Sequence, residues 1–242
     1  MNNIKRIINF CVSIFFPKIC SCCGKNLPIN YESNICADCK EKLHLNNGLI
    51  CVKCSLPLLD GGMHCKDCKT NKQIFFDKLL SAYIYKDDIA TLIKKFKYNK
   101  KTFLAKDLSA EIINLIYKNK LDEITDFVVP LPLHFFKKFK RGFNQSELIA
   151  KEISKNINKP IYPKLLIRKK YTTPQFNLSK EERMKNLEKV FAVNKKYKNI
   201  VNGKNILLVD DIATTCTSAN LCSKELKCAG AKKVFVITIA RD

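Results

Sequence analysis

The sequence predicts an α/β protein, a mostly parallel sheet with helices on both faces, preceded by a small metal-binding module. Beyond about residue 74, short apolar runs alternate with amphipathic helical segments, the pattern of parallel sheets covered by helices. Eight of the 13 cysteines fall before residue 70 in spaced pairs, which indicates a separate small unit. We therefore expect one domain over residues 15–70 and a second over residues 75–242.

The first unit carries four Cys-x-x-Cys pairs, separated by intervals of 12, 11 and 10 residues. Two thiolates at this spacing can hold one metal ion from a tight turn, and two such turns complete a tetrahedron. We therefore expect two structural Zn²⁺ ions. Sequential pairing of the turns is the simplest arrangement, interleaved pairing stays open, and Cys22 competes with Cys23 as a ligand. The expected ligands are Cys20, Cys23, Cys36, Cys39, Cys51, Cys54, Cys65 and Cys68.

Two other interpretations of these cysteines are less favoured. A disulfide framework is typical of small secreted proteins, whereas these pairs crowd into one end of a long, enzyme-like chain. Four Cys-x-x-Cys pairs in tandem argue against redox-active motifs. The apolar segment before the cysteines resembles a signal peptide but lacks a small-x-small cleavage site. We expect instead a short helix packed on the domain, and a cytoplasmic protein.

The chain is strongly basic, with 44 Lys and Arg against 22 Asp and Glu and a formal net charge of +22. Such a surface attracts polyanions, which here means nucleic acid, phosphate-rich substrates or anionic membrane. No run reaches the roughly 18 apolar residues that span a bilayer. The sequence therefore predicts no transmembrane span, and it leaves open a peripheral position at the inner membrane.

The second unit divides into strands and helices by hydrophobic period. In chain order we expect a strand at 78–85, helices at 87–100 and 104–119, a strand at 125–133 and a helix at 144–157. Residues 161–193 look loop-rich. A strand at 205–210, a helix at 217–228 capped by Gly230, and a strand at 232–240 complete the domain.

The segment after the strand at 205–210 has the character of a ligand site. Asp210 and Asp211 stand at a strand end, where open α/β sheets bind ligands. Adjacent carboxylates suit vicinal ribose hydroxyls, directly or through Mg²⁺. The residues that follow bring threonine hydroxyls and backbone N–H groups to a helix N-terminus, which favours phosphate. They are Ala213, Thr214, Thr215, Cys216 and Thr217.

In these motifs the chain resembles the ComF family. Members of that family join a double zinc ribbon to a phosphoribosyltransferase-like domain and are associated with DNA uptake in natural transformation. The resemblance rests on the four cysteine pairs and on "ILLVDDIATTCTSAN", similar to the phosphoribosyl pyrophosphate signature Asp-Asp-x-x-Thr-Thr-Gly-x-Thr. It also rests on "VVPLPLHFFKKFKRGFNQS" and "LLIRKKYTTPQFNLSKEERMKNLEKVF". It covers the chain from about residue 15 onward and implies a phosphoribosyltransferase-like fold.

The resemblance also implies roles for single residues. Asp210 and Asp211 would hold ribose hydroxyls of a phosphoribosyl pyrophosphate-type ligand that arrives with Mg²⁺, and residues 213–217 its 5-phosphate. Residues 130–133 would face pyrophosphate. Residues 168–186 would cover the site, and its polar contacts would include Arg168, Gln175 and Arg183. Asn144 we interpret as a helix N-cap.

Cys216 stands where the signature has glycine. A glycine there would permit a positive φ, and a cysteine in that conformation costs roughly 1–2 kcal/mol. This cost is small enough for the site to be weakened rather than lost. A thiol at a helix N-terminus also tends to have a lowered pKa.

Clusters of lysine and phenylalanine suggest a second kind of ligand. Cations for phosphates and aromatic faces for bases are what single-stranded DNA binding requires. Together with the resemblance to the ComF family, these clusters imply a protein that handles incoming single-stranded DNA, with a DNA-uptake helicase or channel component as a partner. An active phosphoribosyltransferase and a zinc-ribbon adaptor for other proteins are the alternatives. The expected DNA contacts are Lys94, Lys95, Lys97, Lys137, Lys138, Lys140 and Arg141.

Overall fold

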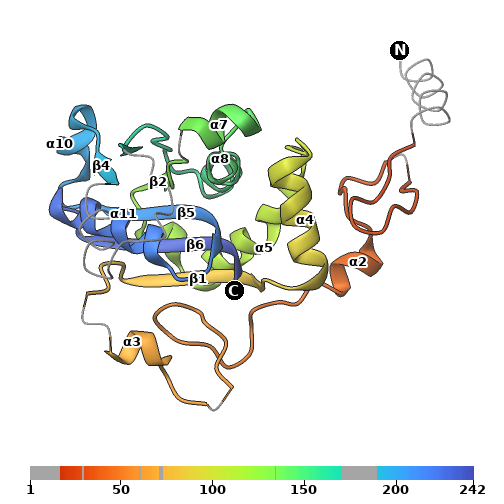
Figure 1. Cartoon of the computed structure of the whole chain (residues 1–242), viewed down its shortest axis with the longest axis horizontal. Coiled ribbons are helices and arrows are strands. Elements are labelled where there is room, and N and C mark those ends of the chain that lie inside the picture. The colour runs from red at the N-terminus through yellow and green to blue at the C-terminus, as the bar shows by residue number, and fades with distance from the viewer. Residues whose placement is uncertain (1–16, 29, 60, 71–72, 134, 170–189) are drawn as a thin grey trace, which may run out of the picture.

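The structure is a computed structural model that describes residues 17–28, 30–59, 61–70, 73–133, 135–169 and 190–242. Its centre is a sheet of four parallel strands in the order β1-β6-β5-β2 (Figure 1). These strands are β1 (Lys78–Ile84), β2 (Phe127–Pro130), β5 (Asn205–Ala213) and β6 (Lys233–Arg241). The expected parallel sheet is confirmed.

Alternate residues of each strand point to opposite faces, because side chains in a strand have a period of two. Leu207 and Val209 of β5 join the core on one face, and Ile206 and Leu208 join the core on the other. A strand buried on both sides needs a continuous apolar run, which is what "NILLV" provides. The expected cover of helices on both faces is therefore confirmed as well.

Three long helices cover the first face, and their buried residues recur at helical spacing. They are α4 (Asp87–Tyr98), α5 (Leu104–Lys118) and α8 (Gln145–Ile157). The second face is covered by α11 (Thr217–Cys228) and by an antiparallel pair of strands, β3 (Leu166–Arg168) and β4 (Phe191–Val193). Short helices complete the described fold: α6 (Leu121–Ile124), α7 (Phe135–Arg141), the 3₁₀ turn η1 (Lys195–Tyr197) and α10 (Lys198–Val201).

Two expectations needed correction. The strand expected at 205–210 continues to Ala213, so both aspartates lie inside β5 near its carboxyl end, because the pairing with β6 extends through Arg241. The region 161–193, expected to be loop, contains β3 and β4 at its described ends. Strands of three residues are too short to show a clear hydrophobic period.

The cysteine-rich segment forms two small modules that pack on opposite faces of the sheet, each with one short helix, α2 (Ala37–Glu41) or α3 (Lys66–Thr70) (Figure 1). The first module contributes Cys20 and Ile35 to the core beneath α4 and α5. The second contributes Cys51 and Cys54 to the core beneath α11. Each module therefore depends on the sheet for part of its own apolar packing.

The connection between the two modules protects the edge of the sheet. The backbone N–H of Asn46 donates to the Ala82 carbonyl at 2.9 Å, and the N–H of Ile84 donates to the His44 carbonyl at 2.9 Å. An open edge strand such as β1 would otherwise present unpaired backbone groups to other chains. Within the described residues, no helix has the length and apolar character needed to cross a membrane.

Candidate functional site

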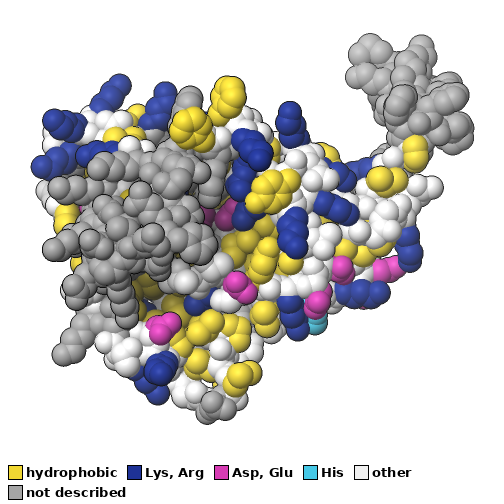
Figure 2. All heavy atoms as spheres, viewed as in Figure 1, with side chains coloured by type: hydrophobic (Ala, Val, Ile, Leu, Met, Phe, Trp, Pro, Cys, Tyr) yellow, Lys and Arg dark blue, Asp and Glu magenta, His cyan; other side chains and the backbone are white. Residues whose placement is uncertain are grey.

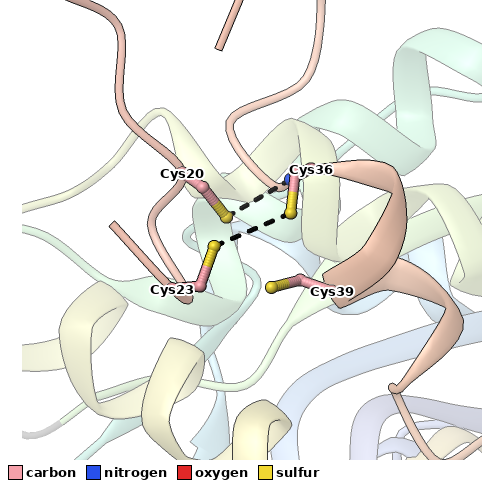
Figure 3. Close-up of side chains that lie close together, drawn as sticks. All are labelled: Cys20, Cys23, Cys36 and Cys39. Atoms are coloured by element: carbon pink, nitrogen blue, oxygen red, sulfur yellow. Dashed lines mark hydrogen bonds between the residues drawn. The ribbon is translucent and has the colours of Figure 1, made fainter. Parts of the chain in front are cut away.

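The eight paired cysteines form two clusters with the geometry of metal sites. Cys20, Cys23, Cys36 and Cys39 make the first cluster, and within it every sulfur lies within 4.8 Å of the others (Figure 3). The second cluster, equally compact, contains Cys51, Cys54, Cys65 and Cys68. The pairing is thus sequential, and Cys23 rather than Cys22 completes the first cluster. Four convergent sulfurs are the donor set of a closed structural zinc site.

The backbone around Cys20 in the first cluster favours a thiolate. Sγ of Cys20 accepts the N–H groups of Cys22 at 3.4 Å and Cys36 at 3.3 Å. Burial acts to raise the pKa of Cys20, but these backbone hydrogen bonds outweigh it and lower that pKa to about 6. Because zinc binds the deprotonated sulfur, the donor set and its surroundings fit Zn²⁺.

The two aspartates near the end of β5 have different partners. Asp210 accepts a hydrogen bond from the Ser146 hydroxyl at 3.0 Å and from the N–H of Asp211 at 2.8 Å. Burial, followed by the charge of Asp211, raises the pKa of Asp210 to about 7. Its carboxyl group is therefore close to its titration midpoint near neutral pH.

Asp211 forms an ion pair with a lysine that comes from another element. Nζ of Lys97, near the C-terminal end of α4, lies 2.9 Å from Oδ2 of Asp211. Only 15% of each side chain is exposed. Lys97 was expected to contact DNA, and the structure instead turns it inward to the end of β5. Lys97 is therefore not part of the surface that could contact DNA.

The segment after the aspartates is a turn that leads into α11. Cys216 has φ 57° and ψ 6°, so it adopts the left-handed conformation for which glycine is favoured. Thr214, Thr215 and Thr217 are exposed, and the hydroxyls of Thr215 and Thr217 lie 2.9 Å apart. We call Asp210, Asp211 and residues 213–217 the β5–α11 site.

The Cys216 thiol differs from the expectation for a helix N-terminus. Burial raises the pKa of Cys216, and the nearby Arg241 guanidinium only partly offsets this effect. The side chain packs against the core of the α11 face instead of pointing into water. A reactive thiolate at this position is therefore not supported.

The Arg-Gly-Phe-Asn-Gln-Ser segment holds the end of β2 beside β5. Asn144 caps α8 by accepting the N–H of Ser146, as expected, and its amide also donates to the Leu131 carbonyl at 3.0 Å. The Leu131 N–H in turn donates to the Val209 carbonyl at 2.8 Å. Through Ser146, the same segment orients Asp210. This motif therefore has a structural role in shaping the β5–α11 site.

Arg241, at the end of β6, connects the second cysteine module to the same site. Its side chain is 5% exposed and donates to the carbonyls of Cys54 at 3.1 Å and Ala213 at 2.9 Å, and also to that of Thr214. A cavity of about 240 Å³ separates the two parts, lined by thiols of the second cluster, by residues 215–217 and by Arg241. The module and the loop thus share one buried cation.

The remaining residues expected at the site divide into two groups. Arg168 lies half-buried on β3, with its guanidinium 5.3 Å from the Phe191 ring centroid, and burial lowers its pKa. Gln175 and Arg183 lie outside the described residues. The structure thus places Arg168 beside the core of the α11 face and leaves the expected cover over the site untested.

Of the other basic residues expected to bind DNA, some are exposed and some contact the protein itself. Nζ of Lys95 donates to the Ser21 carbonyl at 2.6 Å and so anchors the first cysteine module, whereas Lys94 is exposed. Lys138 and Lys140 are exposed on α7, and the side chain of Lys137 lies outside the description. The guanidinium of Arg141 lies 5.0 Å from the Tyr98 ring centroid.

Large aromatic side chains are exposed beside these cations. Tyr98 is 64% exposed, Phe136 64% and Phe139 80%. Basic and hydrophobic side chains gather over α7 and the adjacent end of α4, with acidic side chains set deeper beside them (Figure 2). We call Tyr98, Phe136, Lys138, Phe139, Lys140 and Arg141 the aromatic–basic surface.

Sequence reasoning missed three residues of this region. Ser146 had a visible signal, because it directly follows Asn-Gln in a motif already singled out. The inward position of Lys97 had none, since it is one of five lysines within residues 94–101. Arg241 follows an apolar strand at the end of the chain, where a basic residue ordinarily faces solvent.

Comparison with known proteins gives relatives for both parts of the chain. Residues 11–69 match the family model described as a double zinc ribbon domain. Competence protein F of Haemophilus influenzae is 26% identical over 230 residues, which cover 94% of this chain and 98% of that protein. Competence protein ComFC of Bacillus subtilis is 27% identical, with 87% of this chain and 85% of that protein covered.

Among solved structures, a purine phosphoribosyltransferase from Pyrococcus horikoshii is similar with a TM-score of 0.33 and 12% identity. The match covers 58% of this chain and 83% of that chain. Together, the two cysteine clusters and the matched family model identify structural zinc as a constituent of this protein.

Because each cluster would hold one ion, we expect substitution of a single cluster cysteine to remove one zinc ion from the protein. The purified chain should contain two Zn²⁺ ions, and Cys65→Ser should contain one, because three sulfurs no longer close a tetrahedron. Atomic emission on desalted protein measures this. Cys228→Ser, an exposed cysteine outside both clusters, is the control and should keep two ions. Two ions retained in Cys65→Ser would contradict the assignment.

Because of the Asp210 carboxyl, we expect the free energy of unfolding to depend on pH. The pKa of this carboxyl is raised to about 7 in the folded chain, whereas an aspartate in the unfolded chain releases its proton near pH 4. The free energy of unfolding therefore decreases as the pH rises from about 4 through 7. Asp210→Asn removes this loss. The urea midpoint of the variant relative to wild type should therefore be higher at pH 8 than at pH 5.

The control for this pH effect is Glu123→Gln, which changes an exposed carboxylate on α6. Its midpoint difference from wild type should be the same at both pH values. A pH-independent difference for Asp210→Asn as well would show that this carboxyl is ionised in the folded chain throughout the range.

Proposed function

The chain belongs to the ComF family, and on that premise we propose that it takes part in DNA uptake by binding single-stranded DNA and a phosphoribosyl pyrophosphate-type ligand. The names of the relatives support the biological role, since two of them are called competence proteins. The observation that carries the molecular part is the aromatic–basic surface, which lies beside the β5–α11 site.

The aromatic–basic surface has the composition that single-stranded DNA binding requires. Exposed rings offer stacking platforms for bases of any sequence, and adjacent cations follow the phosphate backbone. Tyr98 and Arg141 are already held together, since the Arg141 guanidinium donates to the Tyr98 hydroxyl at 3.3 Å. Arg141 also donates to the Gln145 side chain at 3.0 Å. This part of the surface is therefore ordered before DNA arrives.

The β5–α11 site supports the second ligand. Two carboxylates at the end of a parallel strand suit a ribose diol, and exposed threonines before a helix of 12 residues suit a phosphate. Mg²⁺, when bound, would neutralise the pyrophosphate of such a ligand. Asp210 and Asp211, near the carboxyl end of β5, would hold the sugar that carries it.

The two binding surfaces adjoin through α4. Lys97 reaches the β5–α11 site, and the next residue, Tyr98, belongs to the aromatic–basic surface. A DNA strand bound to the aromatic–basic surface would pass close to the sugar-phosphate ligand. We place this function in the cytoplasm, where a reducing environment keeps the cysteines available for zinc, with a DNA-uptake helicase or channel component as the partner that delivers the strand.

Transferase activity is the second candidate, because both aspartates and all three threonines of the signature are present. It requires an acceptor that displaces pyrophosphate from the ribose. Release of pyrophosphate above the hydrolytic background, in the presence of nucleobases, would distinguish an enzyme from a protein that only binds the ligand.

The DNA proposal predicts a measurable salt dependence. Lys138→Ala/Lys140→Ala removes two cations from the aromatic–basic surface, and each lost phosphate contact should lower the salt slope by about 0.7, or about 1.4 in total. Fluorescence anisotropy with a labelled oligo(dT) measures this between low and moderate salt. Phe139→Ala should weaken binding by about 1–3 kcal/mol through lost stacking, with the slope unchanged.

The matched control is Lys195→Ala/Lys196→Ala, two exposed lysines of η1, next to α10 and away from α7 (Figure 1). It removes the same charge and should leave the slope unchanged. Equal losses in both double variants would show that DNA responds only to net charge. Binding by wild type no stronger than by a neutral protein at low salt would refute the proposal.

Cys216 provides a test of the sugar-phosphate ligand. Cys216→Gly removes a left-handed cysteine, worth roughly 1–2 kcal/mol, together with the bulk beside the phosphate-facing backbone. Affinity for phosphoribosyl pyrophosphate with Mg²⁺, measured by calorimetry, should increase. Cys216→Ala removes the sulfur but keeps the Cβ, so it should gain less. Unchanged affinity in both variants would mean that the missing glycine has no effect on the loop.

A further inference from the structure

Lys97 is the only one of the basic residues expected to bind DNA that the described structure places against a carboxylate of the β5–α11 site. Its Nζ lies 2.9 Å from Oδ2 of Asp211, and both side chains are 85% shielded from solvent, with 15% exposed. A half-exposed lysine would be screened and mobile. At this degree of burial the ammonium is instead a fixed part of the site.

The neighbours of Lys97 on α4 hold the ammonium in place. Lys95 is bound to the Ser21 carbonyl at 2.6 Å, and Phe96 is fully buried with its ring centroid 5.9 Å from that of Phe143. Tyr98 stacks with Arg141. Because residues on both sides of Lys97 are anchored, this turn of the helix cannot shift far without breaking several contacts, and the position of Lys97 is preorganised.

Two adjacent carboxylates carry like charges that disfavour each other, which a proton on one of them or a nearby positive charge relieves. A divalent ion can supply it, and so can an ammonium that the protein carries itself. Here Ser146 donates to Asp210 and Lys97 neutralises Asp211. The donor set is thus compensated by side chains of this chain, and Oδ1 of Asp211 is left to accept a sugar hydroxyl.

We propose that Lys97 is the resident counter-cation of the β5–α11 site, and that it allows this site to bind pentose 5-phosphates without a divalent cation. This inference rests on the proposed sugar-phosphate function and specifies its ligand class. The ligands would be sugars with a vicinal diol and a 5-phosphate, including those that have no pyrophosphate to carry Mg²⁺. Lys97 is on this view a specificity-determining residue.

The test compares ribose 5-phosphate binding with and without Mg²⁺. Buffers are freed of divalent ions by ion-exchange resin before the zinc-loaded protein is added, because a strong chelator would also remove the structural zinc. Calorimetry and thermal shift are the two readouts. Wild type should bind ribose 5-phosphate without Mg²⁺, and millimolar Mg²⁺ should change the affinity by less than about threefold, a small part of one charge-assisted hydrogen bond.

Lys97→Met should lose about tenfold or more in affinity without Mg²⁺, the size of one charge-assisted hydrogen bond. Millimolar Mg²⁺ should restore most of it, since the metal then supplies the missing positive charge. Lys97→Arg should keep metal-independent binding. Lys118→Met, an exposed lysine in the last turn of α5, is the matched control and should behave as wild type.

The outcomes separate this inference from the proposed function. Wild type that binds ribose 5-phosphate only with Mg²⁺ overturns the role of Lys97 but leaves the sugar-phosphate site intact. Lys97→Met with unchanged affinity in the absence of Mg²⁺ does the same. No binding of ribose 5-phosphate or phosphoribosyl pyrophosphate under any condition overturns both. If Lys97→Met does not fold, the wild-type and Lys97→Arg titrations still decide the question.

Discussion

The hydrogen bonds of the buried Arg241 guanidinium hold the second cysteine module, the end of β6 and the β5–α11 loop together. The guanidinium is bonded to the carbonyl of Cys54 in the second zinc module and to the carbonyls of Ala213 and Thr214 in the loop. A buried cation is stable only when its donors are satisfied, and removal of its partners leaves a costly unpaired charge. The module, the end of β6 and the loop therefore have to fold as one unit.

The first zinc module reaches the same region from the opposite face, through α4. Lys95 binds its Ser21 carbonyl, and two residues later Lys97 binds Asp211. Asn34 of this module also donates to Asp107 on α5 at 2.8 Å. The two cysteine modules thus have a structural role. They fix the helix and the loop that flank the carboxylates.

Much of the fold was predictable because it rests on period and spacing. The start of β5 and both ends of the amphipathic α4 and α5 agree closely with the expected residues. The Cys-x-x-Cys spacing identified both metal clusters. The inward turn of Lys97 was not predictable, since whether a lysine faces solvent depends on the packing of α4 against β5. The role of Arg241 was not predictable either, because its partners are backbone carbonyls far away in sequence.

We propose that the β5–α11 site still binds a sugar phosphate although Cys216 replaces the expected glycine. Calorimetric titration of the zinc-loaded chain with phosphoribosyl pyrophosphate and Mg²⁺ tests it most directly. We expect saturable binding with one ligand per chain. This binding should be abolished in a variant with both aspartates changed to asparagine that is still folded and zinc-loaded. Absence of saturable heat in wild type, or equal binding by the double variant, would contradict it.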